Sequence, residues 1–206
     1  MRAFLLLTSF VFILCSSPLR AEKSVEMLQD FLNNTKSMQA GFQQKLFDPR
    51  GALLQQSVGK FTLSRPGKFI WDYVLPYPQK IISNGKKIWI YDSELEQVII
   101  KPYQQMLSGT PVLLLENDAD LAKDFQLVDL GYEHNQYWLS LIPKSEDKAF
   151  KEIIVGMTAD GLQTMKLIDG FEQTTVIEFE QLIINPKLSN DIFNFIVPQG
   201  MDVIGG

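Results

Sequence analysis

Few side chains in this sequence have the type and spacing needed for catalysis or metal binding. The single histidine, His134, lies in the polar stretch "GYEHNQY", which is typical of a solvated hairpin turn. Glu178 and Glu180 share one face of a strand, where solvation is the ordinary explanation for an acidic pair. The sequence contains no Gly-x-Ser-x-Gly, no His-Glu-x-x-His and no phosphate-binding loop. It therefore predicts a protein that is not an enzyme and that uses no metal or cofactor.

A cation stands at the start of the most aromatic segment. In "SRPGKFIWDYVLPYPQK", Arg65 and Pro66 precede Phe69 and Trp71, which point to one side of a strand. A guanidinium beside an apolar core must find hydrogen-bond acceptors or carry a large desolvation cost. We expect Arg65 and Pro66 to form a latch in which the guanidinium binds carbonyls of a lid. A surface arginine whose stem packs on the aromatic rings is the alternative interpretation.

One helix and a long series of strands position these groups. The segment "EKSVEMLQDFLNNTK" (22–36) carries one apolar stripe, as an amphipathic helix does. Alternating segments joined by tight turns follow it, which predicts an antiparallel meander of about eleven strands ending with "FNFIVP" (193–198). The segment 103–124 breaks this pattern with an apolar run and a short polar helix. We expect it to be a helical lid with a hinge at Gly109–Pro111.

Several strands carry large apolar residues on both faces, as in "KKIWIYD", so neither face is simply solvated. One helix and a short lid cannot cover such a sheet, which predicts a sheet that curls on itself. The interior is then either packed solid or a cavity for an apolar ligand. We expect the second: a mainly β fold, an open antiparallel β-barrel with an N-terminal helix and a mid-chain lid over an apolar cavity. The expected lining residues are Phe42, Phe69, Trp71, Trp89 and Leu114.

The N-terminal segment "MRAFLLLTSFVFILCSSPLRA" has the layout of a secretory signal peptide, with a basic start, a short apolar run and small residues. We expect residues 1–21 to be removed and residues 22–206 to form one domain in the periplasm. Cys15, the only cysteine, lies in this segment. A lipid anchor at Cys15 is the alternative, and Leu14 before it argues against that. The formal net charge of −5 and the absence of a basic cluster argue against nucleic-acid binding.

The block "RPGKFIWDYVLPYPQKIISNGKKIWIYDSELEQVIIKP" resembles the central block of the LolA family of periplasmic lipoprotein carriers. That family reads Arg-Pro, two variable residues, Phe, a variable residue and Trp, followed by a "SDGKxxWxYDxxLEQ" pattern. The matching residues here begin at Arg65 and end at Gln97, with Ser-Asn-Gly in place of Ser-Asp-Gly. The ending "FNFIVPQGMDVI" is also similar to the family's C-terminal signature, and "SGTPVLLL" stands where the family has its helical lid.

The resemblance implies an open barrel that takes acylated lipoproteins from the inner-membrane ABC transporter LolCDE and gives them to the outer-membrane receptor LolB. It also implies that Arg65 helps to fix the closed lid and that Phe69 and Trp71 line the acyl site. We expect a monomeric carrier that recognises the acylated N-terminal cysteine of its cargo. A carrier or sensor of another lipid with the same fold is the alternative. The receptor itself would need a lipidated N-terminal cysteine, and a two-domain regulator would need a longer chain.

Overall fold

The computed structural model of this chain describes residues 23–106, 112–116, 121–145 and 149–205. The expected signal peptide and the Gly109–Pro111 hinge lie outside these residues. None of the described helices has the length and hydropathy that a membrane span requires.

The described strands form one twelve-stranded sheet in the order β12-β6-β5-β4-β3-β2-β1-β11-β10-β9-β8-β7. Neighbouring strands are antiparallel, except that β12 runs parallel to β6. The strands are β1 (Ser37–Phe47), β2 (Leu53–Ser64), β3 (Lys68–Leu75), β4 (Gln79–Asn84), β5 (Lys87–Asp92), β6 (Gln97–Pro102), β7 (Phe125–Glu133), β8 (Gln136–Pro143), β9 (Phe150–Thr158), β10 (Gly161–Asp169), β11 (Thr174–Ile184) and β12 (Asp202–Gly205).

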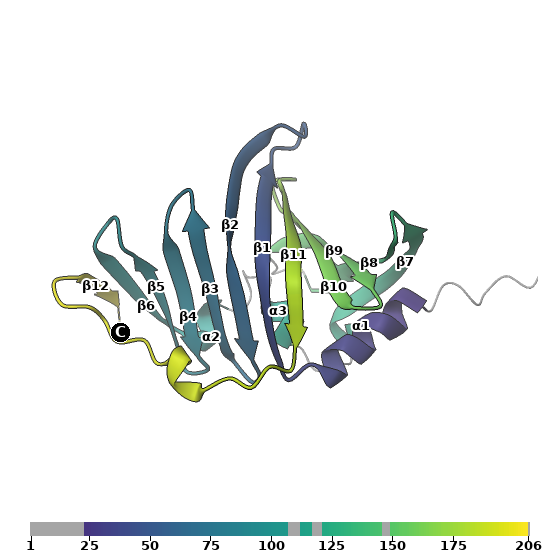
Figure 1. Ribbon diagram of the computed structural model, residues 1–206. Helices are drawn as coiled ribbons and strands as arrows, with labels where there is room; N and C mark the ends of the chain where they lie inside the picture. The colour runs from purple at the N-terminus through teal and green to yellow at the C-terminus, as the bar shows by residue number, and fades with distance from the viewer. Residues whose placement is uncertain (1–22, 107–111, 117–120, 146–148, 206) are drawn as a thin grey trace, which may run out of the picture.

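The sheet curves but does not close, because β7 and β12 end its two sides (Figure 1). Its inner face meets the helices, and its outer face is crossed by the segment after β11, which passes in front of the sheet in Figure 1. These helices are α1 (Lys23–Asn34), α2 (Tyr103–Met106), α3 (Val112–Glu116) and α4 (Leu121–Asp124), whereas the 3-10 helix η2 (Asn190–Phe193) belongs to the segment on the outer face. The prediction of a mainly β, open antiparallel sheet with a helical cover is therefore confirmed.

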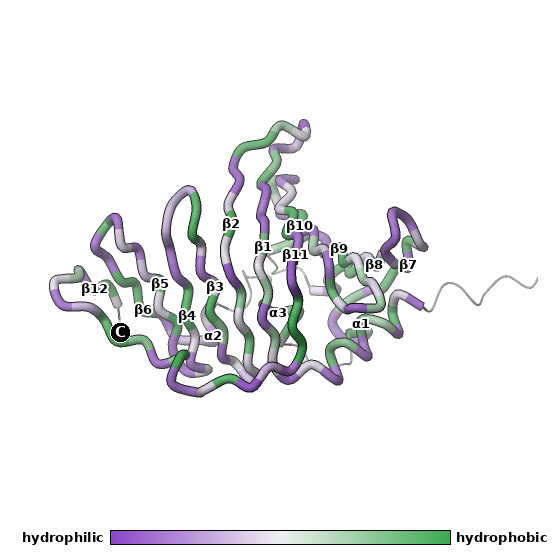
Figure 2. Tube along the Cα trace, in the orientation of Figure 1, coloured by the Kyte–Doolittle hydropathy of each residue, from purple (hydrophilic) through white to green (hydrophobic). Residues whose placement is uncertain are grey.

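Alternation along the strands decides which side chain meets which layer. In β3, Phe69 and Trp71 belong to the main core on the inner face, whereas Ile70 between them packs into a second cluster on the outer face. Figure 2 shows hydrophilic and hydrophobic residues alternating along the central strands, as expected when successive side chains point to opposite faces. The main core joins this inner face to α1 through Leu28 and Leu32 and to α3 through Leu114.

The C-terminal region differs from the sequence prediction. Residues 193–198 do not form a strand. η2 ends at Phe193, and the residues from there to Gly200 pair with no strand. Phe195 and Val197 instead pack against the outer cluster, so their alternation reflects side-chain packing on a sheet that is already paired. The last strand is β12, which adds to the edge of the sheet beside β6.

Candidate functional site

The inner face carries a group of large aromatic side chains on three neighbouring strands. Phe42, Phe61, Phe69 and Trp71 are all almost completely buried. The Trp71 ring centroid lies 4.6 Å from that of Phe61 and 5.2 Å from that of Phe42. Strand register produces this arrangement, because Phe61 of β2 is paired directly with Trp71 of β3. We call these four residues the aromatic floor.

A glycine makes room for the floor. Gly59 is paired with Phe42 across β1 and β2, and a Cβ at position 59 would lie 2.7 Å from the Phe42 ring and 2.1 Å from the carbonyl oxygen of Asp72. Any side chain here would displace the ring or the backbone. Sequence reasoning missed both Gly59 and Phe61, although Phe61 continues the alternation of β2 that could have indicated it.

The floor is buried in a core that also contains residues from the helices. Leu28 and Leu32 of α1 and Leu114 and Leu115 of α3 belong to the same continuous apolar cluster as the floor, and each is at most 2% exposed. The structure thus brings together Phe42, Phe69, Trp71 and Leu114 of the five predicted lining residues. An apolar ligand that reaches the floor must displace part of this core.

Trp89, the fifth predicted residue, lies on the opposite face, which corrects that expectation. It packs with Ile82 and Val98 in the outer cluster, and its ring centroid is 6.3 Å from that of Phe195. Because β5 is apolar on both sides, its sequence does not show which side faces inward. Ile88, the residue before Trp89, is the one that joins the main core.

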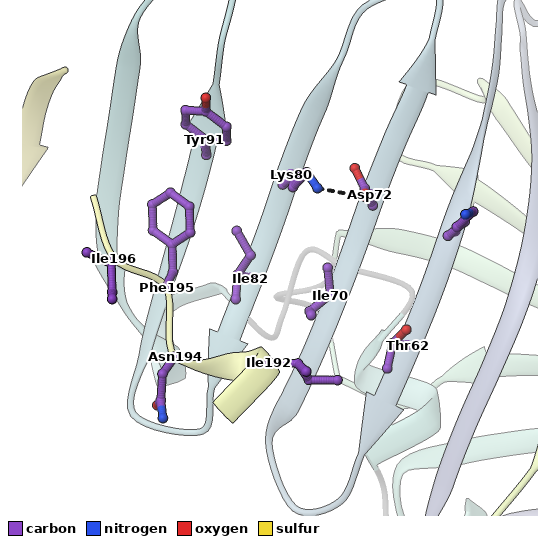
Figure 3. Close-up of a pocket in the computed structure, with 11 residues that line it drawn as sticks. Thr62, Ile70, Asp72, Lys80, Ile82, Tyr91, Ile192, Asn194, Phe195 and Ile196 are labelled. Carbon is purple, nitrogen blue, oxygen red and sulfur yellow. Dashed lines mark ion pairs between the residues drawn. The ribbon is translucent and has the colours of Figure 1, made fainter. Parts of the chain in front are cut away.

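The outer cluster borders a pocket of about 510 Å³ beneath the C-terminal segment. Figure 3 shows Ile70 and Ile82 on the strands facing Ile192 and Phe195 of that segment. Lys80 and Asp72 of the same lining form an ion pair, in which Nζ of Lys80 lies 2.9 Å from Oδ2 of Asp72 (Figure 3). This pocket is separated from the aromatic floor by the thickness of the sheet.

Arg65 and Pro66 form the turn between β2 and β3, with a cis peptide bond between them. Nη1 of Arg65 donates a hydrogen bond to the carbonyl oxygen of Leu32, in the last turn of α1. Its backbone N–H donates to the carbonyl oxygen of Lys36 at 2.9 Å. A cation at a helix C-terminus is favourable, because it meets unpaired carbonyl groups and the negative end of the helix dipole. Arg65 therefore fixes the end of α1 against the rim of the sheet, and its contact with the lid stays a prediction.

Two turns next to Arg65 are joined through a buried hydroxyl. Oγ of Ser83 donates to the carbonyl oxygen of Gly67 at 2.6 Å and accepts a bond from the N–H of Gly85 at 3.2 Å. A Cβ on Gly67 would lie 2.8 Å from Cα of Gly85 and 3.3 Å from the ring of Tyr103. Gly67 and Gly85 also have φ values of 75° and 85°, which disfavour other residues. This packing places the start of α2, at Tyr103, against both turns.

Tyr73 lies between the aromatic floor and the polar side chain of Gln44. Its ring meets Phe42 edge-on, with centroids 5.3 Å apart, and its hydroxyl donates to Oε1 of Gln44 at 3.1 Å. Burial raises the pKa of Tyr73 to about 12, an effect that the hydrogen bond to Gln44 only partly offsets. The hydroxyl therefore stays protonated at neutral pH and remains a donor at the boundary between the apolar and polar regions.

Comparison with known proteins gives a consistent result. A family described as "Outer membrane lipoprotein carrier protein LolA" matches residues 33–196. An outer-membrane lipoprotein carrier protein of Methylococcus capsulatus is 43% identical over 176 residues, covering 85% of each chain. One from Methylobacillus flagellatus is 37% identical over 205 residues and covers 100% of both chains.

A crystal structure of an uncharacterized conserved protein from Thermus thermophilus has a similar fold, with a TM-score of 0.55 at 11% identity. It covers 88% of this chain and 97% of its own. The match shows the shared fold alone. The family match over most of the chain and the two sequence relatives carry the assignment: this chain belongs to the LolA family of outer-membrane lipoprotein carrier proteins.

Proposed function

We propose that this protein is a periplasmic chaperone that binds the acyl chains of outer-membrane lipoproteins and carries them between membranes. The observation that carries this proposal is the aromatic floor, a large apolar group on a curved, open sheet that shares its core with α1 and α3. The sequence relatives of this chain, which are named as outer-membrane lipoprotein carrier proteins, support the same cargo class.

Energetics explain why such a carrier would keep its binding surface covered. Burial of a methylene group contributes about 0.8 kcal/mol, so one long acyl chain gains on the order of ten kcal/mol. A permanently open surface would bind several chains too tightly for release. A cover that must be displaced lowers the net affinity by the cost of opening. We propose that α1 and the lid supply this cost and that Arg65 and Pro66 hold the closed arrangement.

We further propose that the cargo arrives from the inner-membrane transporter LolCDE and leaves to the outer-membrane receptor LolB, through transfer without catalysis. Family membership supports both partners. The part of the chain that the structure describes has no cluster of three or more His, Cys, Asp or Glu side chains arranged to hold a metal ion. Binding, exposure and release of acyl chains are the steps that this fold supports.

Co-purification tests the proposal. The tagged protein is expressed in a periplasm together with a triacylated lipoprotein, and in parallel with the same cargo whose acylated cysteine is changed to alanine. We expect mass spectrometry to detect only the acylated cargo. Recovery of both forms would show a chaperone that recognises the polypeptide. Recovery of free lipid without either cargo would show a carrier of another lipid. Each of these outcomes would overturn the lipoprotein proposal.

A further inference from the structure

A second pocket lies on the inner face, beyond the aromatic floor and toward the tips of the hairpins. Its volume is about 400 Å³, which is within the usual size range of small-molecule sites. Its lining combines three primary amides, two phenols, a serine, an isoleucine and one carboxylate, from Gln44, Gln55, Ser57, Tyr73, Tyr77, Gln79, Ile81 and Asp92.

This amide pocket is continuous with the apolar core. Tyr73 and Ile81 line the pocket and also pack against the main cluster that contains the floor. A ligand whose chains lie on the floor would therefore place the group that follows them in the amide pocket. Cargo of an acyl carrier has such a junction, where fatty acyl chains meet a polar head.

The lining chemistry selects among polar heads. Each glutamine amide offers N–H donors and a carbonyl acceptor, so three of them complement esters, amides and peptide backbone. Among the eight lining residues there is no lysine or arginine, and the one ionisable carboxylate belongs to Asp92. A phosphate placed here would meet an anion and no cation. Lys45 and Lys80 of the neighbouring strands instead pair with acidic residues, at Glu178 and Asp72.

We propose that the amide pocket binds the neutral ester and amide groups at the acylated N-terminal residue of the cargo and disfavours anionic phospholipid heads. The inference rests on the proposed function and adds to it a basis for selection between lipoproteins and the phospholipids that surround them. The acyl chains supply the binding affinity, and the amide pocket determines whether a lipoprotein or a phospholipid is bound.

The test measures displacement of a fluorescent fatty acid from the purified protein by two probes with identical palmitoyl chains. One probe is a synthetic peptide with a dipalmitoyl-glyceryl cysteine at its N-terminus, and the other is dipalmitoyl phosphatidylglycerol. We expect the lipopeptide to bind at least about tenfold more tightly than the phospholipid, because its ester and amide groups pair with the glutamine amides of the pocket. In the double variant Gln55→Leu/Gln79→Leu, the lipopeptide should lose about tenfold. The phospholipid should lose less, because it shares the two glyceryl esters with the lipopeptide but has no peptide amides.

Two further variants sharpen the result. Asp92→Asn keeps an oxygen for the hydrogen bonds from the N–H groups of Glu94 and Leu95, so it preserves the turn while removing the charge, and it should strengthen phospholipid binding. Gln43→Leu is the matched control, because Gln43 is the neighbour of Gln44 on β1 but bonds Glu180 on the outer face. It should leave both affinities unchanged.

The possible failures are distinguishable. If the fluorescent fatty acid binds but the two probes compete equally, or if the double variant keeps the wild-type preference, the amide pocket has no selective role and the acyl-carrier function stands. If the wild-type protein does not bind the fatty acid, the proposed function and this inference both fail.

Discussion

Replacement of Arg65 by leucine should make the protein bind acyl chains more tightly and release them more slowly. The guanidinium of Arg65 donates to the carbonyl oxygen of Leu32 and so holds the end of α1, which packs on β7–β10 and shares the apolar core with the floor. A hydrogen bond from a charged group contributes about 1.5–3 kcal/mol. If this bond exists only in the closed arrangement, its loss lowers the cost of opening by that amount. At 1.4 kcal/mol per factor of ten, affinity should rise roughly 10- to 150-fold.

Equilibrium titration with a fluorescent fatty acid and stopped-flow release measure this effect, and urea unfolding measures stability in parallel. We expect Arg65→Leu to lower the free energy of unfolding by about 1.5–3 kcal/mol while it raises affinity. Arg50→Leu is the matched control, because Arg50 is exposed in the turn between β1 and β2, away from α1. It should change neither quantity.

Opposite changes in stability and affinity are the signature of a latch, since general damage to the fold would lower both. If Arg65→Leu is less stable but binds and releases the fatty acid at wild-type rates, Arg65 only supports α1. The latch reasoning would then be refuted, whereas the role of the aromatic floor would be unaffected.

Three other substitutions test the local packing. Tyr73→Phe should reduce the loss of stability at high pH. The pKa of Tyr73 is about 12 in the folded chain and about 10 in the unfolded chain. The free energy of unfolding of the wild type therefore falls as pH rises from about 10 to about 12. Urea unfolding at pH 11 should show wild type losing about 1.4 kcal/mol more than the variant, relative to pH 8; equal losses would contradict the burial of Tyr73. Ser83→Ala removes the buried bond to Gly67 and should cost about 1–3 kcal/mol in thermal or urea unfolding, and an unchanged stability would show that the two turns hold without it. Asp129→Ala removes the carboxylate that accepts the 2.6 Å hydrogen bond from Oγ of Ser24 at the start of α1. Amide hydrogen exchange should therefore become faster in α1 while the sheet amides keep their rates. Equally faster exchange in α1 and in the sheet would show that α1 does not open separately.

The inner surface was partly predictable from sequence because strand alternation fixes which side chains share a face. Phe69 and Trp71 are two residues apart on β3 and lie together on the floor, as expected. Trp89 was misplaced because Ile88 and Trp89 are both apolar, so alternation shows that they point to opposite sides without showing which side is inner. Only the position of the strand in the sheet settles that choice.

Long-range contacts account for the remaining differences. The bond from Arg65 to Leu32 joins residues 33 positions apart, and no local pattern indicates that a helix terminus accepts it. The segment with Phe195 alternates like a strand because it packs on the outer face of an existing sheet. The amide pocket gathers glutamines from β1, β2 and β4, and isolated glutamines in strands carry no sequence signal of a shared site.

The central claim is that acyl chains bind the inner face, at the aromatic floor. The most direct measurement loads the protein with a lipoprotein whose acyl chains carry a diazirine, irradiates the complex and maps the crosslinked residues by mass spectrometry. We predict labels at Phe42, Phe61 and Trp71 and on the underside of the cover at Leu114. Labels confined to Trp89 and Phe195 on the outer face would contradict the claim and would place the acyl site under the C-terminal segment.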